Sequence, residues 1–249
     1  MALQPWRTGK VIRIEDATYN TKRFFIQVPE LDDFDFIPGQ FVTLDLPIHE
    51  KKNKRWRSYS IASWPDGTNV FELLIVLLEG GAGTTYLFNE VSVGSELTYR
   101  GALGVFTLPQ PVEKDLFLIC TGTGIAPFRS MLQYMHLHNQ PHKNIYLIFG
   151  CRTQKDLLYY DEMKKLAGEL ENFSFMPTLS REQWDGHQGY VHGLYEEICN
   201  LNNKACTDLA NLKPASFFLC GWKAMIDDAR KRIAELGYDK KSVHLELYG

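Results

Sequence analysis

The chain has 249 residues, of which 45% are hydrophobic and 23% are charged, and its formal net charge at pH 7 is −3. These values suit a globular protein of one large or two ordinary domains, and a slightly acidic chain is a poor general binder of nucleic acid. No apolar run approaches the roughly 18 residues that a membrane span requires. The N-terminal residues lack the pattern of a signal peptide, so the cytoplasm is the expected compartment.

The first part of the chain, from residue 10 to about 108, is predicted to form β-strands. Short apolar runs alternate with turn signals such as Pro38-Gly39 and Pro65-Asp66-Gly67. The expected strands are Lys10–Glu15, Lys22–Val28, Gln40–Leu46, Arg55–Ile61, Val70–Leu78 and Glu96–Arg100. Six short strands with one helical segment, from Thr84 to about Glu90, favour a small antiparallel barrel.

From about Val112, apolar strands alternate with segments of helical length. The expected strands are Leu116–Cys120, Asn144–Gly150, Phe173–Leu179, Ser216–Cys220 and Val243–Leu247, the last of them buried. The expected helices are Ala126–His138, Lys155–Glu169, Val191–Asn200 and Lys223–Leu236. This alternation predicts a parallel sheet with helices on both faces. The turn Leu108-Pro109-Gln110-Pro111 is the expected boundary, which gives domains 1–111 and 112–249.

Two motifs in the first domain are typical of flavin binding. On the strand Arg57-Ser58-Tyr59-Ser60, the arginine can neutralise a phosphate, the tyrosine offers a flat ring and the last serine offers a small hydroxyl. The loop Gly80–Thr85 leads into a helix, where free N–H groups and the hydroxyls of Thr84 and Thr85 can bind an anion. A plain polar strand and a simple turn are the alternatives.

A third motif, Thr121-Gly122-Thr123-Gly124, lies between an apolar strand and a helix in the second domain. Such a turn exposes backbone N–H groups to a pyrophosphate. It is shorter than the Gly-x-Gly-x-x-Gly pattern of dinucleotide-binding folds, because Pro127 and Phe128 follow it. A flavin site followed by a dinucleotide site indicates electron transfer from a nicotinamide.

In this order, the motifs resemble those of the ferredoxin–NADP reductase family over nearly the whole chain. The further segments that match the family are Gly80–Thr85, Leu179-Ser180-Arg181-Glu182, Phe218–Met225 and Leu245–Tyr248. The resemblance implies FAD and NADP(H) as cofactors. It also implies a six-stranded antiparallel Greek-key β-barrel followed by an α/β nucleotide-binding domain with a five-stranded parallel sheet.

The resemblance assigns roles to the flavin-binding residues of the first domain. Arg57 is expected to bind an FAD phosphate, Tyr59 to pack on the flavin ring and Ser60 to form a hydrogen bond near N5, with Ser58 on the same strand. The residues of the second phosphate loop are Gly83, Thr84 and Thr85.

Roles in the second domain follow from the same resemblance. Thr123 and Gly124 are expected to bind the pyrophosphate of the coenzyme. Cys220 and Gly221 are expected beside the nicotinamide, where the thiol orients the ring. Glu246 matches the active-site carboxylate, and Tyr248 matches a terminal aromatic residue that covers the flavin, although Gly249 extends this chain by one residue.

The choice of coenzyme is predicted from residues 180–191. A guanidinium at Arg181 and a hydroxyl at Ser180 suit the 2′-phosphate of NADPH. The following stretch, Trp184–Val191, has the Trp-x-Gly-x-x-Gly-x-Val pattern of many NADH-using relatives, and His187 is its only cationic side chain. NADPH is favoured, with NADH as the alternative.

The electron acceptor is expected to be a separate protein, ferredoxin or flavodoxin. The five cysteines include no Cys-x-x-Cys pair, and the histidines show no ligand spacing, so neither an iron–sulfur cluster nor another metal site is expected. A docking patch for an acidic carrier is predicted at Lys51, Lys52, Lys54 and Arg55. The same segment could instead be a solvated loop.

The sequence therefore predicts a flavoprotein that moves electrons between NADPH and a one-electron carrier. The closest alternative is an NADH-dependent reductase component of an oxygenase system. A non-catalytic flavin electron-transfer subunit and a flavin-binding interaction module are the alternatives without turnover.

Overall fold

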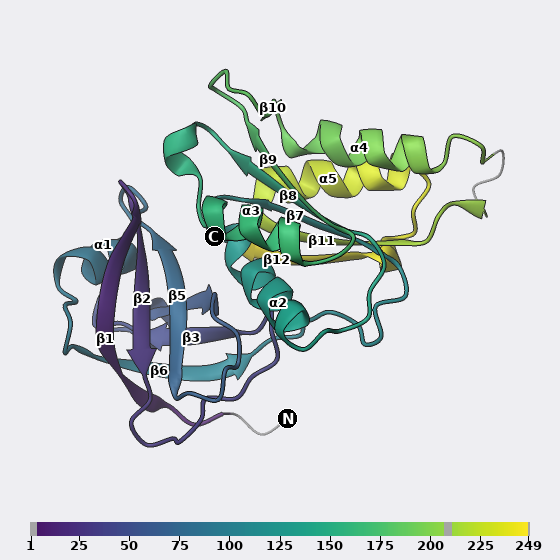
Figure 1. Ribbon diagram of the computed structural model, residues 1–249. Helices are drawn as coiled ribbons and strands as arrows, with labels where there is room; N and C mark the ends of the chain where they lie inside the picture. Colours follow the sequence, from purple (N-terminus) through teal and green to yellow (C-terminus); the bar gives the residue numbers. More distant parts are fainter. Residues whose placement is uncertain (1–3, 207–210, 249) are drawn as a thin grey trace. The chain divides into compact units, whose positions relative to one another are not determined.

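The computed structural model describes residues 4–206 and 211–248, and the chain divides into two compact units (Figure 1). The first unit comprises Met1–Leu108 together with Ala126–His138. The second comprises Pro109–Ile125 together with Asn139–Gly249. Each unit has its own apolar core, as separate domains do.

Six antiparallel strands form the sheet of the first unit. They are β1 (Arg7–Thr18), β2 (Thr21–Gln27), β3 (Phe41–Asp45), β4 (Trp56–Ser60), β5 (Val70–Val76) and β6 (Glu96–Leu103). The strands pair in the order β4-β3-β6-β1-β2-β5. An antiparallel bridge between Ile61 and Leu73 joins the chain after β4 to β5 at the opposite edge, which closes the sheet into a barrel. The predicted six-stranded antiparallel architecture is confirmed.

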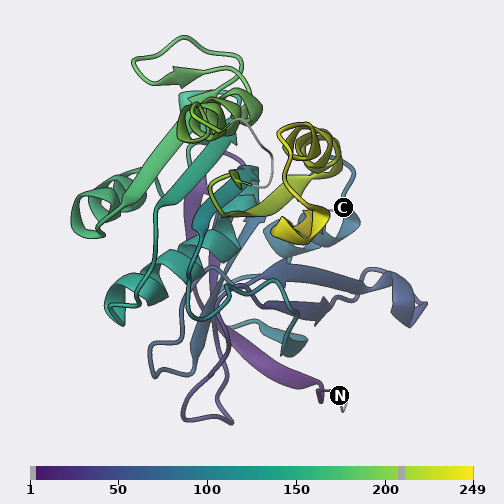
Figure 2. The same ribbon diagram turned by 90° about the vertical axis from the view of Figure 1, so that its right-hand side faces the viewer.

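Apolar side chains from the strands fill the barrel, because alternate residues of each strand point inward. Val42 and Leu44 of β3 are wholly buried, and Leu87 of α1 (Ala82–Asn89) packs into the same core. A short 3-10 turn at Lys52–Lys54 lies at the outer end of the hairpin formed by β3 and β4 (Figure 2).

Helix α2 (Ile125–Leu137) packs mainly within the first unit, although it follows strand β7 (Asp115–Thr121) of the second unit in the chain. The rings of Phe128 and Phe106 are 5.8 Å apart. The turn at Gly39 also approaches this helix, and a Cβ atom there would lie 2.5 Å from the Met131 Cε atom. The helix therefore belongs to the packing of the barrel.

The second unit is built on a parallel sheet of six strands in the order β10-β9-β8-β7-β11-β12. The strands other than β7 are β8 (Ile145–Cys151), β9 (Phe173–Leu179), β10 (His187–Gln188), β11 (Ala215–Trp222) and β12 (Val243–Tyr248). The central strands β7 and β11 are almost wholly buried, as expected for a parallel sheet that is covered on both faces.

Three helices cover this sheet: α3 (Tyr160–Glu169), α4 (Val191–Asn202) and α5 (Lys223–Glu235). Helices α4 and α5 lie side by side on one face, where they share a core with β7 and β11 (Figure 1). Met176 of β9 packs against that core, and the ring of its neighbour Phe175 contacts Tyr160 of α3. Because successive strand residues point to opposite faces, α3 covers the other face.

Three details of the second unit differ from the sequence-based prediction. The sheet has a sixth strand, β10, which is only two residues long. Helix α3 begins at Tyr160 instead of Lys155, because Thr153 and Asp156 form a capping box around a separate 3-10 turn and Tyr159 has a left-handed backbone conformation. Strand β12 is parallel as predicted, but it is the edge strand and Leu247 is 51% exposed, so the expectation of a buried strand is wrong.

Among residues 4–206 and 211–248, no helix has the length and apolar character needed to cross a membrane. Within the same described residues, His, Cys, Asp and Glu side chains form no group of three or more that could hold a metal ion.

Candidate functional site

The strand expected to bind flavin is β4. Along it, the exposed side chains of Trp56 and Ser58 alternate with the partly buried ones of Arg57 and Tyr59. Tyr59 pairs with Val42 in the ladder and packs against the barrel core. Burial raises the pKa of Tyr59 to about 12, with Arg57 opposing the shift, so the phenol is neutral at physiological pH. Ser58 bonds to the Thr43 hydroxyl at 2.9 Å, and Ser60 is buried.

The two expected phosphate-binding motifs of the first unit lie in direct contact. A Cβ atom at Gly83 would lie 2.9 Å from Cγ and 3.1 Å from Nε of Arg57. Arg57 donates its Nη1 hydrogens to the carbonyls of Lys54 and Trp56, at 3.1 and 2.8 Å. Among the described residues its Nε and Nη2 atoms have no partner. The guanidinium therefore has donors free for a phosphate beside the start of α1.

The loop before α1 also suits an anion. Gly81 at the N-cap forms no side-chain cap, which leaves the first N–H groups of the helix available. The Thr84 hydroxyl receives a hydrogen bond from the Leu78 N–H at 3.1 Å and lies 3.1 Å from the Gly81 carbonyl. Its role is thus to hold the loop, whereas Thr85 is exposed. An arginine, a side-chain-free Gly83 and a helix start together fit the phosphates of FAD.

In the second unit, the glycine-rich loop meets the end of β11. Gly124 lies so close to this strand that a Cβ atom there would be 2.3 Å from the Cys220 carbonyl oxygen. A Cβ atom at Gly221 would be 2.4 Å from the Thr121 Oγ1 atom. Strands β7 and β11 are adjacent in the sheet while their chain connections run in opposite directions, which is where such folds bind nucleotides. Thr123 lies in the same loop, between Thr121 and Gly124, the two residues that make these contacts with β11.

Thr121 is a candidate site residue that the sequence analysis did not select. Its Oγ1 atom is buried and has no hydrogen-bond partner among residues 4–206 and 211–248, which is unusual for a buried polar group. It lies beside Gly221, whose backbone has a φ of +147°. An unpaired hydroxyl beside Gly221 suits a polar ligand group such as a nicotinamide amide.

Cys220 is fully buried and pairs with Cys120 across the β7–β11 ladder. Burial raises the pKa of the Cys120 thiol well above its ordinary value, and the nearby Cys220 and Cys151 sulfurs add to the shift. Glu246 of β12 is the ladder partner of Cys220 on its other side, so the structure brings these two predicted residues together.

The end of the chain is described only in part. The backbone of Tyr248 pairs with Trp222, but its side chain and Gly249 lie outside the described residues. The stacking of Tyr248 on a flavin therefore stays a prediction.

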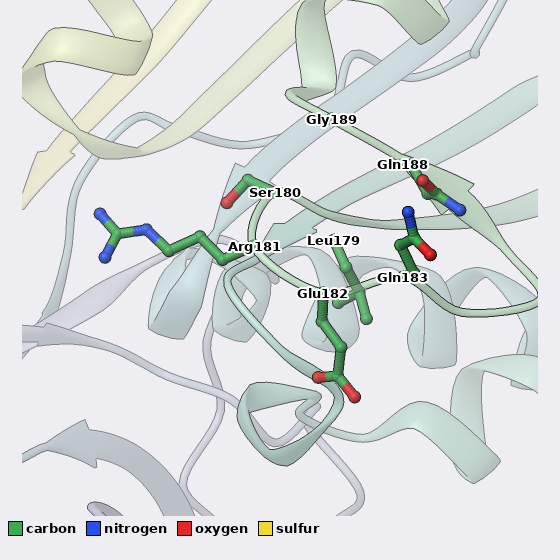
Figure 3. A pocket seen from close by; sticks show the side chains of 7 residues that line it. All are labelled: Leu179, Ser180, Arg181, Glu182, Gln183, Gln188 and Gly189. Carbon is green, nitrogen blue, oxygen red and sulfur yellow. The ribbon is translucent and has the colours of Figure 1, made fainter.

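A cavity of about 250 Å³ follows the end of β9, where the 2′-phosphate site is predicted. It is lined by Leu179, Ser180, Arg181, Glu182, Gln183, Gln188 and Gly189 (Figure 3). The Arg181 side chain extends away from the two glutamines, which lie close to each other on the far side (Figure 3). The Ser180 hydroxyl bonds to the Cys151 carbonyl at 3.2 Å. Ser180 and Arg181, which are predicted to bind the 2′-phosphate, thus line the same cavity.

Two residues near this cavity bear on the coenzyme: Arg152, which the sequence analysis did not select, and Glu182, which lies in a matched segment but was given no role of its own. The N–H of Arg181 bonds to the carbonyl of Arg152 at 2.9 Å, so a second exposed arginine lies beside the first. The carboxylate of Glu182 accepts two hydrogen bonds from Gln154, both 2.8 Å long. Arg152 could have been found from the sheet order, because β8 and β9 are neighbours whose carboxyl ends meet at one edge.

The tryptophan–glycine pattern of residues 184–189 has a structural explanation. The Trp184 indole N–H bonds to the His187 carbonyl at 2.7 Å. Its ring covers Gly186, where a Cβ atom would lie 2.4 Å from a ring carbon. Gly189 has a φ of +101°, a conformation that favours glycine. These residues shape the chain on both sides of β10, so the pattern does not by itself identify the coenzyme.

The chain matches two family models in order. Residues 8–108 match a family described as oxidoreductase FAD-binding domain, and residues 118–231 match one described as oxidoreductase NAD-binding domain. We call the close contacts of Gly83 with Arg57 and of Gly124 with Cys220 the two glycine cradles, and both lie within these ranges.

Two curated relatives represent different kinds of reductase. Ferredoxin–NADP reductase B of Sorangium cellulosum is 35% identical over 222 residues, which cover 86% of each chain. The anthranilate 1,2-dioxygenase electron transfer component of Acinetobacter baylyi is 34% identical over 81% of this chain, which spans only 54% of that relative.

Solved structures give the same fold over nearly the whole chain. A ferredoxin–NADP+ reductase from Neisseria gonorrhoeae with bound FAD and NADP aligns with a TM-score of 0.79 and 25% identity, covering 97% of this chain and 98% of that one. A cytochrome P450 reductase from Amycolatopsis aligns with a TM-score of 0.81 and 26% identity, covering 98% of this chain and 70% of that one.

Proposed function

The chain belongs to the ferredoxin–NADP reductase family of flavoprotein oxidoreductases, and from this we propose that it transfers electrons between NADPH and a one-electron carrier protein. The proposal rests above all on the two glycine cradles, Gly83 against Arg57 and Gly124 against Cys220. They provide one site for a flavin and one for a nicotinamide nucleotide. Residues 1–111 are assigned to FAD and residues 112–249 to NADP(H).

When bound, the flavin and the nicotinamide supply the hydride and electron chemistry, and the protein supplies binding and orientation. Arg57 would hold an FAD phosphate together with the N–H groups of Gly83 and Thr84 at the start of α1. The Thr85 N–H donates to the Gly81 carbonyl at 2.9 Å, so Thr85 would contribute its exposed hydroxyl. Tyr59 provides a neutral, half-buried ring for packing on the flavin, and Ser60 provides a hydroxyl near its reactive nitrogen.

The second unit binds and orients the coenzyme. The N–H groups of Thr123 and Gly124 would hold its pyrophosphate. The buried Thr121 hydroxyl, which is unpaired among the described residues, would form a hydrogen bond with the nicotinamide. Cys220 is a buried thiol that shapes this position. By resemblance, Glu246 is the active-site carboxylate, and Tyr248 regulates the access of the nicotinamide.

The preference for NADPH is supported by two neighbouring arginines. Arg181 and Arg152 can both reach toward a doubly charged phosphate at the exposed edge after β8 and β9, and guanidinium groups match phosphate geometry well. Glu182 lines the same cavity and would repel the phosphate. Its hydrogen bonds to Gln154 hold it in place, which limits this repulsion without removing it. The expected discrimination against NADH is therefore moderate.

The proposed partner is ferredoxin or flavodoxin, with Lys51, Lys52 and Lys54 as docking residues. All three are exposed at the tip of the β3–β4 hairpin. Arg55 differs, because its Nε atom lies 2.7 Å from the Asp45 carboxylate and donates to the Leu46 carbonyl. Arg55 thus stabilises the hairpin, and the three lysines attract an acidic carrier.

The second candidate function is the NADH-dependent reductase component of an oxygenase. It is favoured by the match to the dioxygenase electron transfer component and by the carboxylate of Glu182, which is suited to a ribose hydroxyl. This chain spans 54 to 66% of the first oxygenase-reductase relatives, so their activities stay proposals here.

The test mixes the flavin-loaded protein with NADPH and with NADH in a stopped-flow instrument and follows the bleaching of flavin absorbance. Faster reduction by NADPH at low coenzyme concentration supports the proposal, and a preference for NADH favours the oxygenase reductase. A flavin that neither coenzyme reduces would contradict both. The reduced protein is then mixed with ferredoxin, flavodoxin and an oxygenase-type ferredoxin to identify the carrier class.

A further inference from the structure

A buried ion network lies beside the end of the flavin strand and takes no part in the roles assigned so far. Glu72 of β5 is 2% exposed. It accepts hydrogen bonds from Arg23 Nε at 2.7 Å and Nη2 at 3.0 Å, and from Arg129 Nη1 at 3.0 Å. Arg129 of α2 is itself only 5% exposed. Burying such charges is costly, so a network of this kind is a weak explanation of stability alone.

Arg129 also bonds to the chain that follows the flavin strand. Its Nη1 atom donates to the Ala62 carbonyl at 2.8 Å, two residues after Ser60. Its guanidinium carbon lies 5.1 Å from the centre of the Trp64 ring. One side chain therefore holds a carboxylate, a carbonyl and an aromatic ring at once. The planar guanidinium combines a fork of donors with a flat face for the ring, a geometry that a lysine ammonium does not reproduce.

The backbone of Glu72 completes this attachment. The Ala62 N–H donates to the Glu72 carbonyl at 2.8 Å, and the Glu72 N–H donates to the Ser63 hydroxyl at 2.9 Å. On the other side, the Ile61 N–H donates to the Gln40 carbonyl at 3.0 Å. The segment after Ser60 is thus fixed from β5, from the turn before β3 and from α2.

The position of Arg129 in helix α2 also matters. The helix continues directly from the glycine-rich loop at Gly122–Gly124, and Arg129 lies in its second turn. The helix is rigid over this distance, because each residue adds a backbone hydrogen bond. Within the first unit, Arg129 therefore bonds this helix to the segment next to the flavin strand.

We propose that Arg129 is a positioning residue for hydride transfer, which acts by holding the Ser60 segment of the flavin strand in place. This inference rests on the proposed flavin-dependent function, and it goes beyond it by naming a residue outside both cofactor cradles. Arg129 touches neither cofactor in this assignment. Its effect passes through the Ala62 carbonyl to the Ser60 hydroxyl, whose placement decides how readily the flavin nitrogen accepts a hydride.

The test compares holoenzymes of the wild type, Arg129→Lys, Ser60→Ala and the double variant. Arg129→Lys is expected to slow single-turnover flavin reduction by about 10- to 100-fold, the cost of misplacing a reacting group by about an ångström. The FAD dissociation constant is expected to change by less than about 3-fold, because the phosphate contacts are elsewhere. In the Ser60→Ala background, Arg129→Lys is expected to add little, since residues that act through one another are not additive.

A second readout does not depend on turnover. Hydrogen–deuterium exchange is expected to speed up in residues 60–64 of Arg129→Lys and to stay unchanged in residues 122–124. The matched control is Arg230→Lys on the exposed side of α5, which should alter neither exchange nor reduction. If Arg129 variants do not fold, Ser63→Ala removes one bond of the same attachment and should show a smaller change in both readouts.

Additive effects of Ser60→Ala and Arg129→Lys would overturn the inference, as would loss of FAD at an unchanged reduction rate. Equal destabilisation of the whole barrel without local exchange at residues 60–64 would assign Arg129 a purely structural role and overturn it as well. A wild type that no nicotinamide reduces would instead refute the proposed function, and the exchange experiment would still report whether Arg129 holds the segment.

Discussion

Gly124 lies so close to Cys220 that a Cβ atom at the glycine would be 2.3 Å from the cysteine carbonyl oxygen. A Cβ atom is essentially never found this close to a backbone atom. The loop at residues 122–124 can therefore approach the end of β11 only because residue 124 has no side chain. The same strand end carries Gly221, which approaches Thr121 equally closely. Two glycines on different segments thus form one face of the proposed nucleotide site.

Gly124→Ala is therefore expected to weaken coenzyme binding and to destabilise the second unit. The methyl group must push the loop away from β11, which moves the N–H groups that face the pyrophosphate. Isothermal titration with NADP+ should show at least a 10-fold loss of affinity, the equivalent of about one charged hydrogen bond, while FAD stays bound. The matched control is Gly168→Ala, because Gly168 is exposed near the end of α3 with no atom near its Cβ position. That change should stabilise the protein by about 0.4–1 kcal/mol, and an unchanged NADP+ affinity in Gly124→Ala would contradict the site.

In the first unit, Arg57→Ala and Gly83→Ala should both reduce FAD retention, for different reasons. The first removes a charged hydrogen bond to phosphate, worth about 1.5–3 kcal/mol or roughly 10- to 150-fold in affinity. The second leaves the charge but pushes the Arg57 side chain out of its position. FAD titration of the apoprotein measures both, with Arg57→Lys as the variant that keeps the charge without the fork of donors. Chromatography of the flavin released from the wild type should show FAD, and FMN alone would contradict the assignment.

Most secondary-structure elements could be predicted because their hydrophobic patterns are local. The buried runs of β7, β8 and β11 and the motif order from Arg57 to Gly221 are visible in the sequence without any knowledge of contacts. Strand β10 could not be predicted, since two exposed residues, His187 and Gln188, carry no hydrophobic pattern. Exposure of β12 was also missed, because apolar residues of an edge strand look like those of a central one.

The parts of the candidate site that escaped prediction depend on contacts between distant segments. Arg152 lies beside Arg181 only because β8 and β9 are neighbours in the sheet. Arg55 pairs with Asp45 across a hairpin, so its role differs from that of the exposed lysines that precede it. Arg129 reaches Ala62 from a helix that the sequence assigns to the other domain. Each case needs the tertiary fold, which spacing along the chain does not provide.

The coenzyme preference should depend on Arg181 and Arg152 together. Removing either arginine is expected to raise the KM for NADPH by about 10-fold and removing both by about 100-fold, while the KM for NADH changes little. Glu182→Gln should lower the KM for NADPH, because it removes a negative charge from the cavity that receives the phosphate. Steady-state kinetics with both coenzymes and a chemical electron acceptor measures these effects, with Arg230→Ala as the control. Equal losses for NADPH and NADH would show that these arginines do not recognise the 2′-phosphate.

The docking of the electron carrier should depend on the lysines at the tip of the β3–β4 hairpin and not on Arg55. The triple variant Lys51→Gln, Lys52→Gln and Lys54→Gln removes three exposed positive charges without disturbing a described contact of their side chains. Carrier reduction at low ionic strength should slow by about 10-fold, and the difference from the wild type should shrink as salt is added, because surface charges steer association and are screened by ions. Flavin reduction by NADPH, which does not involve the carrier, should stay unchanged. Arg55→Gln should instead lower the thermal stability, since it leaves the half-buried Asp45 carboxylate without its partner.

A triple control with the same change in net charge replaces exposed lysines elsewhere, at Lys10, Lys240 and Lys241. If this control slows carrier reduction as much as the hairpin variant does, the net charge of the protein and not the hairpin attracts the carrier, and the docking surface proposed here is wrong.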